Sequence, residues 1–347
     1  MAFGILGISI YWATSYSLSW AVVSTVIAAA CDEGHQYFVT GRSSRLGDVV
    51  LDTLAAITFI LIARMIKKKA DNIVIYKKIE NLQIVDLHSH ILPNIDDGAK
   101  NMAMSLAMLQ IAKDNGTKSI VATPHVMEGE GLPAWDRIVT ECNALQQASQ
   151  EIGLDLRMFP GSEVAIYGDI LNILTGPGAY CINGGRYLLV ELPSTHIPSG
   201  IDEFFFTLQV RGITPILAHP ERHPQLAKNP EILAKWIGTG VLSQMNGTSI
   251  TGLMGKRVMA TAELLLVNNM VHVIGSDAHS IGQRNTDLTS AVDKITKLIG
   301  PQRAIQLVFE NADNIIFSRD VDIPKIRDIQ YSSTQNSVMH WVGTLWK

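Results

Sequence analysis

Residues 84–98 read IVDLHSHILPNIDDG, an apolar run of strand-forming residues that leads directly into two histidines and then a pair of aspartates. Alternate residues of an extended segment share a face, so His88 and His90 can reach one metal ion together. The same spacing joins Asp277 and His279 in VIGSDAH, residues 273–279. One such pair is a weak signal, because core packing also produces it. Two pairs, on the first and last strands of one domain, are stronger, because closing a sheet makes those strands neighbours.

Short apolar runs alternate with helical patterns between these two motifs. We expect strands at Ile84–His88, Ser119–Thr123, Leu156–Pro160, Tyr187–Glu191, Thr214–Ala218, Val241–Met245 and Val271–Gly275. We expect helices at Met102–Asp114, Trp135–Ile152, Ile166–Leu174, Asp202–Arg211, Pro230–Gly238 and Leu253–Asn268. Gly116, Gly153, Gly212 and Gly240 follow four of these helices, where a left-handed C-terminal cap favours glycine. Such alternation predicts a parallel sheet with right-handed crossovers.

Side chains that can bind a metal stand at or just beyond six of the seven predicted strand ends. The full set is His88, His90, Asp97, His125, Glu163, Glu191, His219, Asp277 and His279. Active sites of parallel barrels gather at the C-terminal ends of the strands. An open sheet offers only a crevice between a few strands. Six converging ends therefore favour a barrel slightly short of eight strands, although Glu163 or His219 alone would also suit a satisfied polar group at the rim.

The chemistry of this set points to metal-dependent hydrolysis. Imidazoles mixed with carboxylates suit divalent Mn, Fe or Zn, and so many ligands suit more than one ion. Close cations activate water and hold phosphoryl oxygens, so phosphate esters are the expected substrates. Asp86 shares the face of His88 and is expected to orient a ligand. Asp96 is expected to cap the turn beside Asp97.

Composition argues against several other classes of protein. The net charge is -4 and no basic stripe with interleaved aromatic residues occurs, so no nucleic-acid partner is expected. Cys31, Cys142 and Cys181 are scattered without a CxxC pair, which argues against a disulfide framework. Neither Cys142 nor Cys181 has an arginine six positions later, so the Cys-x5-Arg phosphate loop of cysteine-dependent tyrosine phosphatases is absent.

The first 70 residues are more apolar than the remainder. Phe3–Ile10, Trp20–Ala30 and Val49–Ile66 are apolar runs, and the third is about as long as a bilayer crossing requires. Three lysines at 67–69 follow it, which by the positive-inside rule places the rest of the chain in the cytoplasm. We therefore expect N-terminal helices that anchor the protein in a membrane, with the rest of the chain on its cytoplasmic face. A pair of buried helices in a soluble protein is the alternative.

The connecting sequence CDEGHQYFVTGRSSRLGDVVLDTLAA, residues 31–56, resembles the VanZ-like membrane family. The matching residues are Asp32, Glu33, His35, Gln36, Gly41, Arg42, Asp48 and Asp52. The first helix is short for that family, so the resemblance implies a truncated module that serves as an anchor. The expected organisation is this segment at 1–69, a linker at 70–83, a catalytic domain at 84–322 and a tail at 323–347.

Residues 84 to about 320 resemble the polymerase-and-histidinol-phosphatase (PHP) superfamily and, within it, the bacterial capsule and exopolysaccharide tyrosine-protein phosphatases. HSHILPNIDDG is the most specific stretch, and ATPH, GSE, LVELP, AHPER and GSDAH follow in the family's order. The resemblance implies a distorted TIM-like (β/α)7 barrel and makes all nine candidates metal ligands. It also implies a centre of three manganese ions, with Fe, Zn, Co or Mg as alternatives. Arg222 in HPER and Arg284 in SIGQR are the implied phosphate-binding residues.

The resemblance implies a manganese-dependent protein-tyrosine phosphatase whose substrate is a bacterial tyrosine autokinase that controls capsule or exopolysaccharide synthesis. The residues themselves establish only a metal-dependent hydrolase of phosphoesters. Two alternatives remain: a small-molecule phosphatase for histidinol phosphate or a sugar phosphate, and a non-catalytic membrane adaptor. After the His125 motif the chain carries Val126 and an acidic loop with Glu128 and Glu130, where many relatives carry a basic residue.

Overall fold

The structure, a computed structural model, describes residues 2–13, 18–38, 50–51, 53–67, 83–127 and 132–327. The chain divides into two compact units, Met1–Lys78 and Ile79–Lys347. Most of the expected linker at 70–83 and most of the expected tail at 323–347 lie outside the described residues, as do Gly41, Arg42, Asp48 and Asp52.

The first unit is helical. Helix α1 is Ala2–Ala13, helix α2 is Leu18–Tyr37, and residues 50–51 and 53–67 are also helical. Tyr11, Ala21 and Ile60 form a small buried cluster that joins these helices. Among the described parts of the chain, none of the helices combines the length and the apolar character that a membrane crossing needs.

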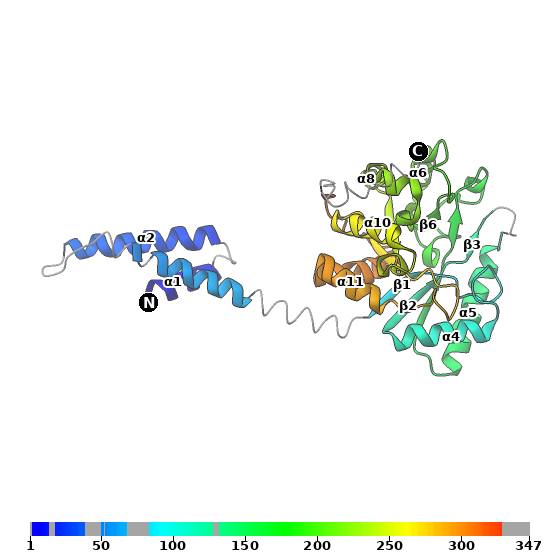
Figure 1. Cartoon of the computed structure of the whole chain (residues 1–347), viewed down its shortest axis with the longest axis horizontal. Coiled ribbons are helices and arrows are strands. Elements are labelled where there is room, and N and C mark those ends of the chain that lie inside the picture. Colours follow the sequence, from blue (N-terminus) through cyan, green and yellow to red (C-terminus); the bar gives the residue numbers. More distant parts are fainter. Residues whose placement is uncertain are drawn as a thin grey trace. The chain divides into compact units, whose positions relative to one another are not determined.

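The second unit is built on parallel strands (Figure 1). The strands are β1 (Ile84–Ser89), β2 (Thr117–Ala122), β3 (His125–Val126), β4 (Arg157–Pro160), β5 (Glu163–Ala165), β6 (Tyr187–Glu191), β7 (Thr214–Ala218), β8 (Leu242–Asn246) and β9 (Val273–Gly275). They form two sheets, in the orders β1-β2-β4 and β3-β5-β6-β7-β8-β9. Only two residues separate β2 from β3, and only two separate β4 from β5. Two chain segments therefore pass from one sheet to the other, and the strands form one curled parallel array.

The curl brings the first strand against the last. Ser89 and Ala278 form a parallel bridge. Asp277 N donates to His88 O at 2.8 Å and His90 N donates to Ala278 O at 2.9 Å. Both histidine-and-carboxylate motifs therefore lie side by side, although they are far apart in the sequence.

Side chains alternate between two apolar layers along each strand. Leu188 and Val190 of β6 belong to the larger buried cluster, which includes the inward faces of the surrounding helices. Tyr187 and Leu189 belong to a second cluster, which contains Ile315 of helix α13 (Asn311–Ile316). This alternation places the first cluster outside the curl and the second cluster, with α13, on its inner side.

The helices of this unit are α4 (Met102–Asp114), α5 (Trp135–Glu151), α6 (Ile201–Val210), α7 (Pro224–Lys228), α8 (Pro230–Gly238), α9 (Gly247–Thr251), α10 (Lys256–Val267), α11 (Thr289–Ile299), α12 (Pro301–Ile305) and α13 (Asn311–Ile316). Helices α4, α5, α6, α8 and α10 match predicted helices within three residues at each end. Gly116 and Gly153 have φ angles of 87° and 76°, which confirms their predicted left-handed caps. The predicted helix at Ile166–Leu174 is wrong, because this segment forms only a 3-10 turn at Ile170–Asn172.

Candidate metal centre

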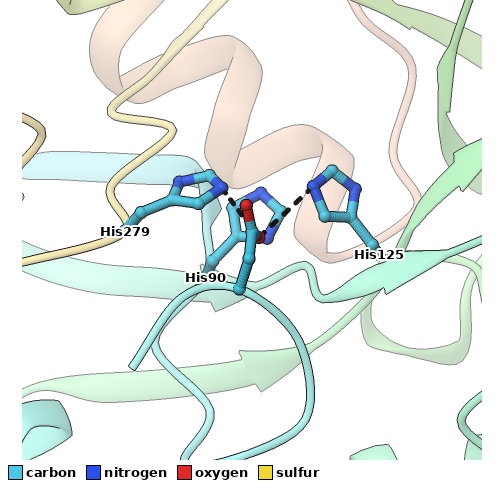
Figure 2. A group of neighbouring side chains, drawn as sticks. His90, His125 and His279 are labelled. Atoms are coloured by element: carbon cyan, nitrogen blue, oxygen red, sulfur yellow. Dashed lines mark ion pairs between the residues drawn. The ribbon is translucent and has the colours of Figure 1, made fainter. Parts of the chain in front are cut away.

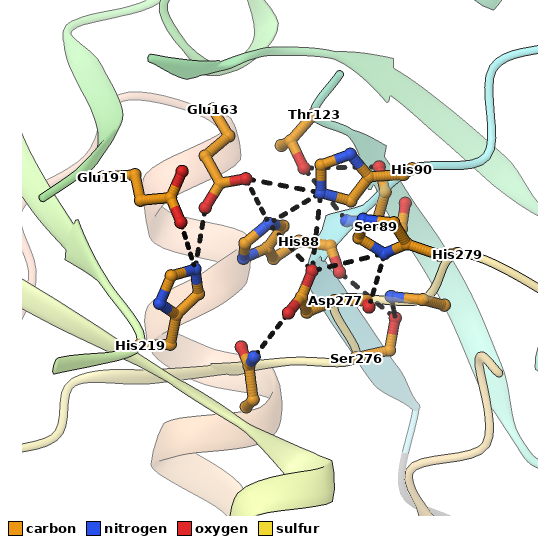
Figure 3. Close-up of polar contacts among 12 residues, drawn as sticks. His88, Ser89, His90, Thr123, Glu163, Glu191, His219, Ser276, Asp277 and His279 are labelled. Atoms are coloured by element: carbon orange, nitrogen blue, oxygen red, sulfur yellow. Dashed lines mark hydrogen bonds and ion pairs between the residues drawn. The ribbon is translucent and has the colours of Figure 1, made fainter. Parts of the chain in front are cut away.

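The nine predicted ligands gather at the carboxyl ends of the strands. Figure 3 shows His88, His90, Glu163, Glu191, His219, Asp277 and His279 pointing toward one another from different strands. His88 lies within β1, Glu163 begins β5 and Glu191 ends β6. His219 directly follows β7, and Asp277 and His279 follow β9. Parallel pairing brings these strand ends to one edge of the array, which explains the convergence.

Glu163 lies at the middle of the cluster and is fully buried. Its Oε2 atom is 3.3 Å from His88 Nε2, 3.4 Å from His90 Nε2 and 3.1 Å from His125 Nδ1. Its Oε1 atom is 2.9 Å from His219 Nε2, which also faces Glu191 Oε1 at 3.6 Å. One carboxylate therefore contacts four imidazoles from three different segments of the chain.

Asp277 has a comparable place on the other side of His88. Its Oδ1 atom is 3.6 Å from His88 Nε2, 3.5 Å from His90 Nε2 and 3.5 Å from His279 Nδ1. Asp277 has a φ of 52° and His219 a φ of 31°, values that non-glycine residues rarely adopt. Such strained residues cluster at functional sites, where the surrounding structure holds them in place.

A third group lies toward solvent. Asp97 Oδ1 is 3.2 Å from His279 Nε2 and 3.7 Å from His125 Nε2, and 64% of the Asp97 side chain is exposed. Figure 2 shows the rings of His90, His125 and His279 around this carboxylate. The exposed face of Asp97 makes this group the open side of the cluster.

Hydrogen bonds fix the ring orientation of two histidines. His90 Nδ1 is 2.7 Å from Asp96 Oδ2, and His279 Nδ1 is 3.0 Å from the carbonyl oxygen of Asp277. Carboxylate and carbonyl oxygens only accept, so both Nδ1 atoms carry the proton. Each Nε2 atom therefore faces the cluster, where it can bind a metal through its lone pair once it carries no proton.

The sequence predicts only that Asp96 caps the turn, and the structure gives this residue a further role. It does cap the turn, since it accepts from Gly98 N at 2.9 Å, but it also binds His90 and accepts from His125 N at 3.1 Å. Burial acts to raise the pKa of Asp96, but the hydrogen bond and the charge of His90 lower it to about 2. Asp96 is therefore ionised and holds two of the candidate ligands.

The cluster suits divalent cations. Four overlapping groups of donor atoms, each spanning at most 4.8 Å, lie within it: His90–Asp97–His125–His279, His88–Glu163–His219, His88–His90–Asp277 and His125–Glu163–Glu191. Glu163 Oε2 and His125 Nδ1 are buried, and neither makes a hydrogen bond of good geometry. His88 Nε2 and His90 Nε2 face one another at 3.1 Å. Nitrogen and oxygen atoms that converge this closely can bind a cation, which takes the place of any proton between them.

Burial acts to raise the pKa of Glu163, but the charge of His88 and contacts with His125 and His219 hold that pKa well below its usual range. The pKa of Asp277 is also held well below its usual range, because His88 and His90 outweigh the effect of burial. Both carboxylates are therefore ionised at neutral pH and carry the charge that a cation needs.

Both predicted phosphate-binding arginines lie at Asp277. Arg222 Nη1 is 2.8 Å from Asp277 Oδ2, and Arg284 Nη2 is 2.9 Å from Asp277 Oδ1. About a third of each side chain is exposed, 35% for Arg222 and 34% for Arg284. The two guanidinium groups thus lie beside the cluster with faces open to solvent.

A surface pocket adjoins the cluster. It is lined by Glu191, Leu192, Ser194, Ala218, His219, Pro220, Arg222 and His223. One side carries candidate ligands and a guanidinium group, while Leu192, Ala218 and Pro220 form an apolar side. The pocket can therefore hold a charged group and an apolar group together.

Gly98 allows the loop of Asp96 and Asp97 to lie against β1. A Cβ atom added at Gly98 would be 2.1 Å from the carbonyl oxygen of His90. A side chain at this position would clash with His90, so glycine allows the turn of Asp96 and Asp97 to stay close to the histidines.

Comparison with known proteins gives two family matches and two similar proteins. The family described as "Capsular polysaccharide synthesis, CpsB/CapC" matches residues 84–317, and the family VanZ/LLP1 matches residues 1–67. The tyrosine-protein phosphatase YwqE of Bacillus subtilis is 31% identical over 238 residues, which cover 69% of this chain and 93% of that protein. The tyrosine-protein phosphatase CpsB of Streptococcus pneumoniae is 28% identical over 241 residues, 68% of this chain and 99% of that protein.

A solved structure agrees with these matches. It comes from work on YwqE of Bacillus subtilis and CpsB of Streptococcus pneumoniae, described as metal-dependent tyrosine phosphatases. It superposes with a TM-score of 0.66 at 30% identity and covers 71% of this chain and all of its own.

Proposed function

The chain belongs to the capsular polysaccharide synthesis family CpsB/CapC, and from that premise we propose that it is a metal-dependent protein-tyrosine phosphatase. The observation that carries the proposal is the arrangement around Glu163, where imidazole nitrogens and carboxylate oxygens converge beside two arginines. We propose that the curled sheet is the seven-stranded PHP-type barrel, in which β2 with β3 and β4 with β5 each count as one strand. The cluster would then be the active site at one end of this barrel.

The nine converging residues are the proposed ligands, and three manganese ions are the proposed complement. Mixed imidazole and carboxylate donors suit manganese, and the four overlapping donor groups suit several ions. When bound, the cations lower the pKa of a water molecule and offset the charge of the phosphoryl oxygens. Glu163 and Asp277 supply the central negative charge, and His88, His90 and His279 present Nε2.

Arg222 and Arg284 are proposed to bind the phosphoryl oxygens of the substrate. Their planar groups stay charged at any physiological pH and can hold two oxygens at once. Leu192 and Pro220 in the adjoining pocket provide an apolar surface for a phenyl ring. A phosphate on an aromatic leaving group therefore fits this pocket better than a fully polar ester does.

A cysteine nucleophile is not part of the proposal. Cys142 and Cys181 are buried. Burial raises their pKa values to about 12 and about 11, so both remain protonated thiols. Neither carries the thiolate that nucleophilic attack needs.

Localisation at the bacterial inner membrane, with the catalytic domain on its cytoplasmic face, is also proposed. Large apolar side chains are exposed along the helical unit, including Trp20 at 66%, Ile27 at 58% and Leu51 at 65%. Exposed apolar surface of this extent marks an interaction site, and a lipid bilayer is the partner that suits it. Anchoring would keep the enzyme near a membrane-bound tyrosine autokinase, the proposed substrate.

The proposal is tested with the full chain in detergent. Release of phosphate from a phosphotyrosyl peptide is measured before chelation, after chelation and after manganese is restored. We expect turnover that chelation removes and manganese restores, and two to three manganese ions per chain by mass spectrometry.

Two outcomes favour the alternatives. Faster turnover of histidinol phosphate or a sugar phosphate than of the peptide would indicate a small-molecule phosphatase. A metal-replete chain without phosphatase activity on any ester would indicate a membrane adaptor.

A further inference from the structure

Strand β8 is unlike the other strands at the site, because its end carries none of the nine proposed ligands. Its sequence, Leu-Ser-Gln-Met-Asn at Leu242–Asn246, is nonetheless fully buried along its whole length. Gln244 and Asn246 are both at 0% exposure. Burying two amide side chains is costly unless each polar atom has a partner.

The amides of these two residues form a series of hydrogen bonds that connects three proposed ligands. Asn246 Nδ2 donates to Asp277 Oδ2 at 2.6 Å, and Gln244 Nε2 donates to Asn246 Oδ1 at 2.9 Å. Gln244 Oε1 then lies 3.1 Å from His88 Nδ1 and accepts from the backbone N–H of His219 at 3.3 Å.

The donor and acceptor of each hydrogen bond in this series are fixed by the groups at its two ends. The ionised carboxylate of Asp277 can only accept, so Asn246 must turn its NH2 group toward it. The backbone N–H of His219 can only donate, so Gln244 must turn its oxygen toward that end. His88 Nδ1 faces the same oxygen and therefore carries a proton. His88 Nε2 faces Glu163 and Asp277 and is the nitrogen that would bind a cation through its lone pair.

We propose that Gln244 and Asn246 are positioning residues of the metal centre. Gln244 sets the ring tautomer and orientation of His88 and holds the left-handed backbone of His219, while Asn246 fixes the second oxygen of Asp277. A histidine that binds a metal through Nε2 usually donates Nδ1–H to an oxygen, and loss of that oxygen weakens metal binding. The inference rests on the proposed metal-dependent function.

Two further contacts support this role. Gly275 of β9 packs between the partners, since a Cβ atom there would be 2.5 Å from His88 Cβ and 2.9 Å from Gln244 Nε2. Asn246 N also donates to Glu221 Oε1 at 3.1 Å. Glu221 precedes Arg222, so β8 connects the histidine cluster with the segment that carries a proposed phosphate-binding arginine.

The test uses zinc, which is diamagnetic, on the full chain. Affinity for zinc is measured by competition with a chromophoric chelator. The protonated nitrogen of each histidine ring is read from 15N-correlated spectra, with the His88 signal identified by its loss in His88→Gln. Neither readout depends on catalytic activity.

The variants distinguish the hydrogen-bonding role of the Gln244 oxygen from the space that its side chain fills. Gln244→Met keeps the volume and removes both polar atoms, and we expect zinc affinity to fall about 10- to 100-fold. The Nδ1–H signal of His88 should also shift or be lost. Gln244→Glu keeps an oxygen for His88, and we expect it to retain the Nδ1–H signal and most of the affinity. Asn246→Leu should lower affinity without changing the His88 tautomer.

Ser243→Ala is the matched control on the same strand. Ser243 is buried, and its hydroxyl contacts Met270 and His272 rather than the cluster. It should leave zinc affinity unchanged. Thermal unfolding in chelator identifies any variant that fails to fold. If Gln244→Met fails to fold, Gln244→Glu is the deciding variant. Loss of the His88 Nδ1–H signal in folded Gln244→Glu overturns the proposal.

The inference is overturned if Gln244→Met binds zinc as tightly as the wild type and keeps the His88 signal. The proposed function fails separately, if the wild-type chain binds no divalent metal at all. The two failures are therefore distinguishable.

Discussion

The Arg284 guanidinium lies 2.9 Å from Asp277 Oδ1, the oxygen that also faces His88, His90 and His279. Arg284 thus contacts the same carboxylate oxygen that the proposed cations would use. An arginine with this placement and a partly open side chain can exchange its carboxylate partner for a substrate phosphoryl oxygen without leaving the site.

Arg284→Ala is therefore expected to lower kcat/KM for a phosphotyrosyl peptide about 100-fold, the usual effect of removing one charged donor from a transition state. Affinity for manganese should not fall, because the arginine and the cation share one oxygen. Steady-state kinetics and a manganese titration check the two parts. Arg284→Lys should recover little, because an ammonium group cannot hold two oxygens at once. Weaker manganese binding in Arg284→Ala would instead indicate that the arginine supports the ligands.

Glu163→Gln should remove at least one ion per chain and lower turnover more than 100-fold. Glu163 is the only described carboxylate with contacts to His88, His90, His125 and His219, and a neutral amide cannot balance cations there. Mass spectrometry of the purified variant measures the ions. Glu203→Gln, at an exposed position on α6, is the control and should keep full metal content. Unchanged metal content in Glu163→Gln would exclude Glu163 as a ligand.

Gly98→Ala tests the acidic turn. The added methyl group would overlap His90, so the turn must move, and Asp96 must move away from the histidine it holds. We expect a loss of about 1–3 kcal/mol in the free energy of unfolding and weaker manganese binding. Gly168→Ala is the matched control, because nothing lies within 4 Å of a Cβ atom there. Equal urea midpoints for both variants would show that the turn adapts at no cost.

His272 is expected to make the fold sensitive to mild acid. Burial, with a contribution from the charge of Arg303, lowers the pKa of His272 to about 3. Its ordinary pKa is near 6.5, so the unfolded chain binds a proton that the folded chain rejects. The contribution is complete above pH 6.5 and is lost as the pH falls toward 3, by ~1.4 kcal/mol per pH unit.

Urea unfolding at pH 7, 6 and 5 in chelator measures this slope. His272→Asn keeps an acceptor for Ser243 N, which donates to His272 Nδ1 at 3.0 Å, but it cannot titrate. The difference in slope between the two proteins isolates the histidine from other titrating groups. Parallel slopes would contradict the prediction.

Much of the strand order follows from the sequence, because each apolar run ends at a polar residue with metal-binding chemistry. All seven predicted strands overlap observed ones. The sequence does not predict that two strands are interrupted, giving β2 and β3 in one place and β4 and β5 in the other. This interruption depends on pairing: β2 pairs with β1 and β4, whereas among the described strands β3 pairs with β5. The sequence of a single strand does not specify which other strand it pairs with.

The site was predictable to the extent that residue type signals chemistry. Histidines and carboxylates were recognised by their affinity for metals, but Gln244 and Asn246 were not, because amides are weak ligands for Mn, Fe or Zn. Their signal was indirect: two amides in an otherwise apolar run, at the end of the one strand without a ligand. The pairing of both arginines with Asp277 had no sequence signal, because it arises only when the last strand meets the first.

Asp86 and Ser276, 190 positions apart, are joined by a hydrogen bond of 2.8 Å where that meeting occurs. During translation, seven of the nine proposed ligands leave the ribosome before Asp277 and His279 do. A nascent chain that ends anywhere before residue 277 lacks Asp277 and His279, and the edge of its first strand that faces away from β2 has no partner. The proposed metal centre is therefore complete only late in synthesis, after the last strand has been made.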